Sequence, residues 1–230
     1  MSISFAEQAV RLVRDTGIYS AGRGVALRAN DMLESGGGAI QLAAGGATVA
    51  LGPASRIFVK SPGELVLLDG WLKLQGGAQG PMTVSTAVLR ATALGTTATL
   101  HAAPGLAEVF AESGDVSVET PAAGKAARPT RIGSEQFATS GGNGLLRTTA
   151  RPPAAFLAAM PRGFRDALVP VAPGNAQLPP KRERDATYAE LAPWLSAHPA
   201  LRQGLQRRSN PPRAARAASA TSARLPIHQP

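Results

Sequence analysis

Three histidines are the side chains best suited to hold a metal ion or to act as a general base. His101 stands near the end of a β-type run, His198 precedes a proline, and His228 lies close to the C-terminus. None has a second ligand at metal-site spacing, and no His-Glu-x-x-His motif occurs. The absence of cysteine excludes disulfides, thiolate zinc sites and iron–sulfur clusters. The sequence therefore predicts no metal and no other cofactor.

The glycine-rich segments do not match phosphate-binding loops. Gly124-Lys125-Ala126 lacks a Ser or Thr after the lysine, and Glu119 occupies the place of the first glycine of a P-loop. Neither Gly36–Gly38 nor Gly45-Gly46 forms the G-x-G-x-x-G pattern that opens a helix in dinucleotide-binding proteins. We interpret these glycines as turn residues.

Two carboxylate pairs could in principle supply an acid and a base. They are Glu108 with Glu112, and Asp115 with Glu119, on either side of a predicted turn. Because turns place polar residues in solvent, we expect all four to be solvated. No Gly-x-Ser-x-Gly motif offers a nucleophile. The sequence therefore predicts that the protein is not an enzyme.

The net positive charge of the chain comes from its C-terminal third. Residues 1–145 carry 11 basic and 11 acidic side chains, whereas residues 146–230 carry 13 and 4, which accounts for the whole net charge of +9. Six arginines after residue 201 are possible contacts for a polyanion: Arg202, Arg207, Arg208, Arg213, Arg216 and Arg224. They could bind anionic polymers or lipids of an envelope, or nucleic acid, or nothing. Nucleic acid is the less favoured ligand because the tail has no aromatic residue for stacking on bases.

The first 22 residues suggest a short helix. Phe5, Ala9, Leu12 and Val13 fall near one helical face. The segment has no basic start followed by an apolar run, so it is not a secretory signal, and an exported protein would need a leader upstream of Met1. No stretch approaches the length of a membrane-spanning helix.

From about Val25 to Thr139 the pattern becomes one of short strands. Apolar and β-branched runs alternate with turn residues about every 8–12 positions, which is typical of sandwiches and barrels. Asp69-Gly70, between two apolar runs, predicts a tight hairpin because a type I′ turn needs positive φ at both central residues. The sequence thus predicts an all-β fold, either a compact β-sandwich or a right-handed β-roll.

The C-terminal third predicts short helices. Phe156, Met160, Phe164 and Leu168 form a helical stripe that Pro161 divides into two short pieces. A second stretch covers residues 187–208, with Pro199 suited to start its last helix. We expect both stripes to cover the β domain. The alternative is that they dock a partner, in which case they would be exposed.

The β region resembles the FecR-like domain family, named for a bacterial periplasmic regulator of ferric citrate uptake. The resemblance rests on four segments in order: Ser35–Val59, Leu65–Leu74, Val84–Leu100 with its Gly-Thr pair, and Glu108–Val118. The residues matching the family's turns are Gly45, Gly46, Asp69, Gly70, Gly95, Thr96 and Gly114, to which the resemblance assigns structural roles. The familiar members also carry a sigma-binding segment and a membrane helix, neither of which is found here.

We divide the chain into an N-terminal segment (1–22), a FecR-like β domain (23–140), a linker (141–153), a helical appendage (154–208) and a disordered basic tail (209–230). The resemblance implies a non-catalytic interaction or sensing module, exported to the periplasm or envelope, that binds an envelope protein or an anionic surface polymer. The alternative is a cytoplasmic binder of nucleic acid or another polyanion that acts through the arginine-rich tail. An enzyme acting on envelope glycans is a third class, for which we identify no catalytic pair.

Overall fold

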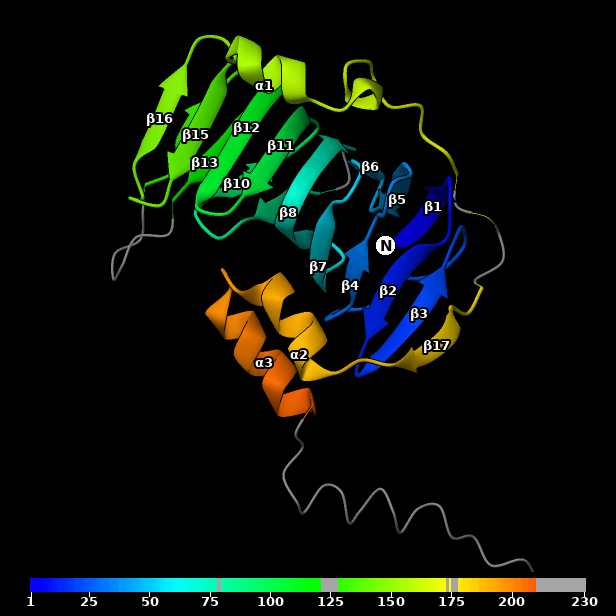
Figure 1. Cartoon of the computed structure of the whole chain (residues 1–230). Coiled ribbons are helices and arrows are strands. Elements are labelled where there is room, and N and C mark those ends of the chain that lie inside the picture. The colour runs from blue at the N-terminus through cyan, green and yellow to red at the C-terminus, as the bar shows by residue number, and fades with distance from the viewer. Residues whose placement is uncertain (78–79, 121–127, 173, 175–177, 210–230) are drawn as a thin grey trace, which may run out of the picture.

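The computed structural model describes residues 1–77, 80–120, 128–172, 174 and 178–209. Within these residues the chain forms two large β-sheets and a few short helices, and the helices follow most of the strands in the sequence (Figure 1). The predicted all-β fold with short C-terminal helices is confirmed. The predicted disordered tail lies almost entirely outside the described residues.

The strands pair into two sheets that share one long strand, β8 (Glu64–Gln75). Sheet A has the order β1 (Ser2–Ala6), β5 (Ile40–Ala44), β6 (Ala47–Leu51), the second half of β8, β11 (Thr97–Ala103), β12 (Leu106–Ser113), β15 (Phe137–Gly141) and β16 (Leu146–Thr149). Sheet B has the order β17 (Lys181–Asp185), β3 (Gly17–Ala21), β2 (Val10–Arg14), β4 (Met32–Glu34), β7 (Arg56–Ser61), the first half of β8, β9 (Met82–Ser85), β10 (Arg90–Ala93), β13 (Val116–Glu119) and β14 (Thr130–Ile132). Neighbouring strands are antiparallel except β8 and β9.

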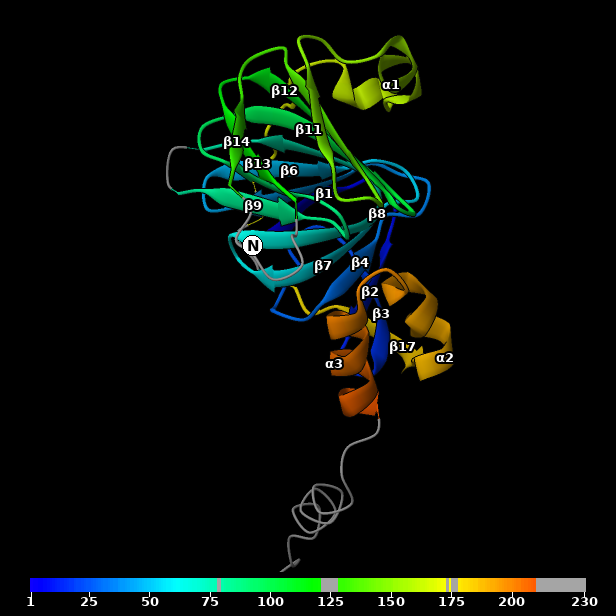
Figure 2. The same ribbon diagram turned by 90° about the vertical axis from the view of Figure 1, so that its left-hand side faces the viewer.

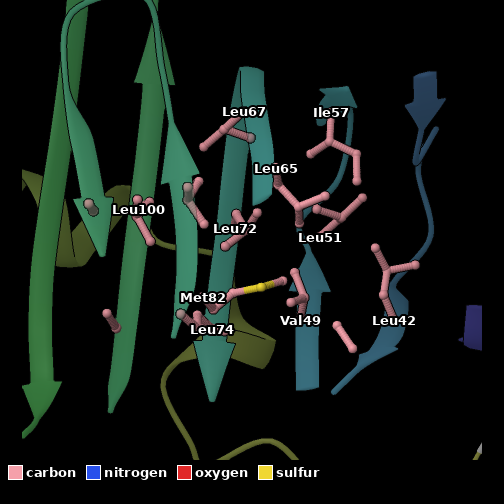
Figure 3. Packing of buried hydrophobic residues seen from close by; sticks show 14 of the residues in the cluster. Leu42, Val49, Leu51, Ile57, Leu65, Leu67, Leu72, Leu74, Met82 and Leu100 are labelled. Atoms are coloured by element: carbon pink, nitrogen blue, oxygen red, sulfur yellow. The ribbon is translucent and has the colours of Figure 1, made fainter. Parts of the chain in front are cut away.

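The two sheets pack face to face around one hydrophobic core. Strands such as β5 and β12 bury every second residue, as expected when one face of a sheet meets a core. Figure 3 shows Leu65, Leu67 and Ile57 of sheet B meeting side chains of sheet A, among them Leu51 and Leu72. The architecture is therefore a β-sandwich, one of the two forms expected.

The hairpin predicted at Asp69-Gly70 is wrong, because β8 runs through this dipeptide without turning. Its first half pairs with β7 in sheet B and its second half with β6 and β11 in sheet A. Gly70 has φ +89°, and a Cβ there would lie 2.5 Å from Oγ of Ser55. The positive φ that suggested a turn instead lets the strand pass Ser55 as it changes sheets.

The predicted N-terminal helix is also wrong. Residues 1–22 form β1, β2 and β3, and β1 pairs with β5 inside sheet A. In β2 the adjacent Leu12 and Val13 are both buried, Leu12 in the central core and Val13 against the C-terminal helices. Burial on both faces removes the alternation by which a strand is recognised.

The C-terminal stripes cover the outer faces of the two sheets. The helix α1 (Ala154–Ala159) and the 3₁₀ turn η1 (Arg162–Phe164) lie on sheet A, where all four residues of the first stripe are buried. The helix α2 (Tyr188–Leu191), the 3₁₀ turn η2 (Ala192–Leu195) and the helix α3 (Pro199–Ser209) pack on sheet B. Figures 1 and 2 show these two groups on separate parts of the sandwich. The packing interpretation of the stripes and the start of a helix at Pro199 are confirmed.

Two strands lie where none was expected. The predicted linker 141–153 contains β16, and the predicted helical appendage contains β17. Both are edge strands with largely or fully exposed side chains. Such strands lack an apolar face, so their sequences carry no alternation that could reveal them.

Candidate functional site

The glycine turns predicted from the resemblance gather at one end of the sandwich, apart from Asp69 and Gly70. Gly45 and Gly46 make the turn between β5 and β6. Oγ1 of Thr96, which follows Gly95, donates to the carbonyl oxygens of Leu94 and Asp115 at 3.0 and 2.9 Å. Gly114 packs beside Thr96. The contact of Thr96 with Leu94 lies within its own turn, and those with Asp115 and Gly114 reach the neighbouring turn, so the geometry gives Thr96 and Gly114 a structural position.

The possible polyanion contacts are only partly described. Arg202 and Arg207 are exposed on α3, and Arg208 is half-buried. Arg213, Arg216 and Arg224 lie outside the described residues. The described part of the chain therefore presents a short basic helix surface.

The outer face of sheet A holds a polar group that the sequence analysis missed. Trp71, His101 and Glu108 are cross-strand neighbours on β8, β11 and β12. Nδ1 of His101 lies 2.8 Å from Oε2 of Glu108, and its ring stacks on Trp71 with centroids 4.3 Å apart. The tight β11–β12 connection at Pro104-Gly105 pairs position 101 with position 108. The spacing of the two residues about this hairpin could therefore have predicted the contact between His101 and Glu108.

A second polar group on this face fixes the covering segment 154–168. Lys73 is fully buried, and its Nζ donates to Oε2 of Glu112 at 2.6 Å and to the carbonyl oxygens of Phe164 and Asp166 at 2.7 and 2.9 Å. Oγ1 of Thr99 donates to the other oxygen of Glu112 at 2.6 Å. The expectation of solvated carboxylates is thus wrong for Glu108 and Glu112, because the covering segment and the aromatic side chains shield this face.

The ends of the sandwich differ in how their strand edges are protected. At one end, the outer edge of β1 is hydrogen-bonded to residues 24–27, including Ile3 N to Val25 O at 2.9 Å. The other edge there, β17, carries only charged side chains, which oppose edge-to-edge pairing. At the opposite end no described strand pairs with the outer edge of β16 or of β14. Leu145, next to β16, is 60% exposed.

Two general features of the described residues bear on function. They contain no helix that is long and apolar enough to cross a membrane. They also contain no group of three or more His, Asp or Glu side chains placed to hold a metal ion.

Comparisons with known proteins give a partial structural likeness. No protein-family model and no curated protein matches the chain. Two similar solved structures, at 1.65 and 2.50 Å resolution, are both described as a "putative anti-sigma factor" from Parabacteroides distasonis ATCC 8503. Each is 16% identical, with TM-scores of 0.42 and 0.45 over 54% and 56% of this chain. The matches cover 59% and 64% of those two chains, so this chain spans about six-tenths of their length.

Proposed function

We propose that this protein is a non-catalytic interaction or sensing module of the bacterial envelope, with a FecR-like domain that binds an envelope protein through an open strand edge. The observation that carries the proposal is the contrast between the two ends of the sandwich. Three features favour β16 as the docking edge: its outer side lacks a described partner strand, its side chains are largely exposed, and Leu145 lies beside it. An extended segment of the partner would add to sheet A, with backbone hydrogen bonds giving affinity.

The edge proposal is tested by site-specific photo-crosslinking in the native cell. A photoreactive residue replaces Thr148 on β16 or, as the matched control, Glu183 on the charged edge strand β17. We expect a discrete crosslinked protein from position 148 and none from position 183. Leu145→Lys should suppress that crosslink, because charge at a sheet edge opposes strand addition, while Leu157→Lys on α1 should not. Equal crosslinking at both edges would contradict the proposal.

The envelope location is tested separately by fractionation. The chain carries a C-terminal tag at its native locus with the upstream DNA intact, and the mature N-terminus is sequenced. A periplasmic or membrane fraction with a processed end supports export. A purely cytoplasmic protein that begins at Met1 would overturn the envelope part of the proposal.

The second candidate function is binding of a polyanion through the C-terminal arginines. It is favoured by Arg202 and Arg207, which are exposed on α3 and form no ion pair with a described residue. Such binding would weaken steeply with salt. DNA binding by the full chain that falls with salt, and that weakens when Arg202 and Arg207 are both replaced by Gln, would favour this function over the module.

A further inference from the structure

A small cavity lies where the two sheets diverge and the C-terminal helices begin. It has a volume of about 230 Å³. Its walls come from β7 and β8, the turn at Thr86, the β11–β12 connection and the end of η2. Cavities between packed substructures, mostly apolar with a few placed polar groups, are typical ligand sites.

One polar group of the cavity is the guanidinium of Arg56, which is held in place from two sides. Its Nε donates to Oε1 of Glu34 at 2.8 Å, and its Cζ lies 4.9 Å from the ring centroid of Trp194. The other oxygen of Glu34 accepts from Arg11 at 3.0 Å. The two Nη groups of Arg56 make no hydrogen bond to a described residue. They remain available to an anionic ligand.

The second polar group is the carboxylate of Asp69. Asp69 is the cross-strand partner of Arg56 in the β7–β8 ladder, a position from which opposite charges commonly pair. Here they do not, and no basic group of the described residues lies within 4.0 Å of Asp69. A register shift after Arg56, together with Glu34 and Trp194, keeps the guanidinium from this carboxylate.

The cavity therefore offers a fixed cation and a free anion that do not neutralise each other by direct contact. The remaining walls are largely aliphatic and include Leu68, Leu106 and Pro193. The volume falls below the roughly 300–1,000 Å³ of pockets for drug-sized ligands. A ligand that fits must be small, must carry both charges, and gains from an apolar substituent.

We propose that this cavity binds a free α-amino acid with an aliphatic side chain. The ligand's carboxylate would accept from the Nη groups of Arg56, its ammonium would donate to Asp69, and its side chain would lie against Leu68 and Leu106. The site goes beyond the partner-binding function and does not depend on it, since the cavity and β16 are built from different strands. It supplies a small-molecule input for a sensing module.

The proposal is tested by calorimetric titration of the full chain with L-leucine, n-butylamine and butyrate. We expect saturable binding of leucine and much weaker binding of the two single-charge probes. Asp69→Asn should weaken leucine binding by about tenfold or more, because the ligand's ammonium then meets a neutral amide oxygen in place of a charged carboxylate. Asp166→Asn, which alters an exposed carboxylate outside the cavity, is the matched control and should leave binding unchanged.

Three outcomes would overturn the proposal. They are no leucine binding by the folded chain, leucine binding that Asp69→Asn leaves intact, and butylamine binding as tight as that of leucine. If Asp69→Asn does not fold, Ala103→Trp fills the cavity from its wall and should abolish binding by a chain whose circular dichroism is unchanged. Crosslinking from Thr148 is read independently, so failure of this site and failure of the proposed function are distinguishable.

Discussion

Lys73 is the largest of the described side chains that lie out of contact with water. Its ammonium has three hydrogen-bond acceptors, one on Glu112 and two on the backbone of the covering segment. Such a charge is tolerated only because every donor is paired. The residue therefore joins sheet A to a segment about 90 positions further along the chain.

Lys73→Met should destabilise the protein by about 3 kcal/mol, because it leaves Oε2 of Glu112 and two carbonyl oxygens without their donor. The free energy of unfolding in urea measures this change. Lys60→Met is the control, since Lys60 forms an exposed pair with Glu64 and its loss should cost less than about 1 kcal/mol. If both variants lost the same free energy of unfolding, the buried contact of Lys73 would contribute no more to stability than the exposed pair of Lys60.

His198 carries a pH dependence. Its Nε2 is buried without a hydrogen-bond partner among the described residues, and burial lowers the pKa of the imidazole below its usual 6.5. His198 therefore takes up a proton more readily in the unfolded chain than in the folded chain. As a result, the free energy of unfolding falls as the pH drops below 6.5. We expect the free energy of unfolding to fall less between about pH 7 and pH 5 in His198→Asn than in the unchanged chain. Parallel pH profiles for the two proteins would contradict this assignment.

At the scale of elements, β8 decides the architecture. One strand of twelve residues serves both sheets, and the change of sheet occurs at Gly70, where Ser55 approaches closest. Oγ of Ser55 accepts from the amide of Trp71 at 2.8 Å and so holds the crossing. A side chain at position 70 has no room.

Gly70→Ala should destabilise the fold by more than about 2 kcal/mol, because a strained φ is combined with a clash against Ser55. Gly95→Ala is the matched control. Gly95 also has positive φ, at +62°, but has open space around it, so only the backbone cost of about 1 kcal/mol applies. Thermal or urea unfolding of both variants measures the difference, and equal values would show that the clash relaxes without cost.

At the scale of the whole molecule, one core connects both sheets, and each sheet has its own outer cover. The chain has two tryptophans, and they report on the two covers separately: Trp71 packs beneath α1, and Trp194 packs on sheet B. Both covers pack on sheets that share one hydrophobic core. We therefore expect neither cover to unfold before the sandwich itself unfolds.

We expect the two single-tryptophan variants, Trp71→Phe and Trp194→Phe, each to unfold in one transition. In each variant the fluorescence of the remaining tryptophan should follow the same urea curve as the far-ultraviolet circular dichroism. Agreement between two probes is the test of a cooperative two-state transition. A fluorescence change that precedes the loss of strand signal would identify a cover that detaches first.

The residue pattern was enough to predict the all-β class, the glycine turns of β5–β6 and β12–β13, and the apolar stripes of the C-terminal third. Each of these is a local pattern that records which side faces a core or where the backbone needs positive φ. Only the folded chain shows that Gly70 crosses between sheets, that residues 1–22 are strands, and that Lys73 and Glu112 meet beneath a segment about 90 positions from Lys73. It also placed Arg56 and Asp69 in one cavity without pairing them. These features depend on what approaches from elsewhere in the chain, and the same dipeptide or run of residues fits either outcome until that neighbour is in place.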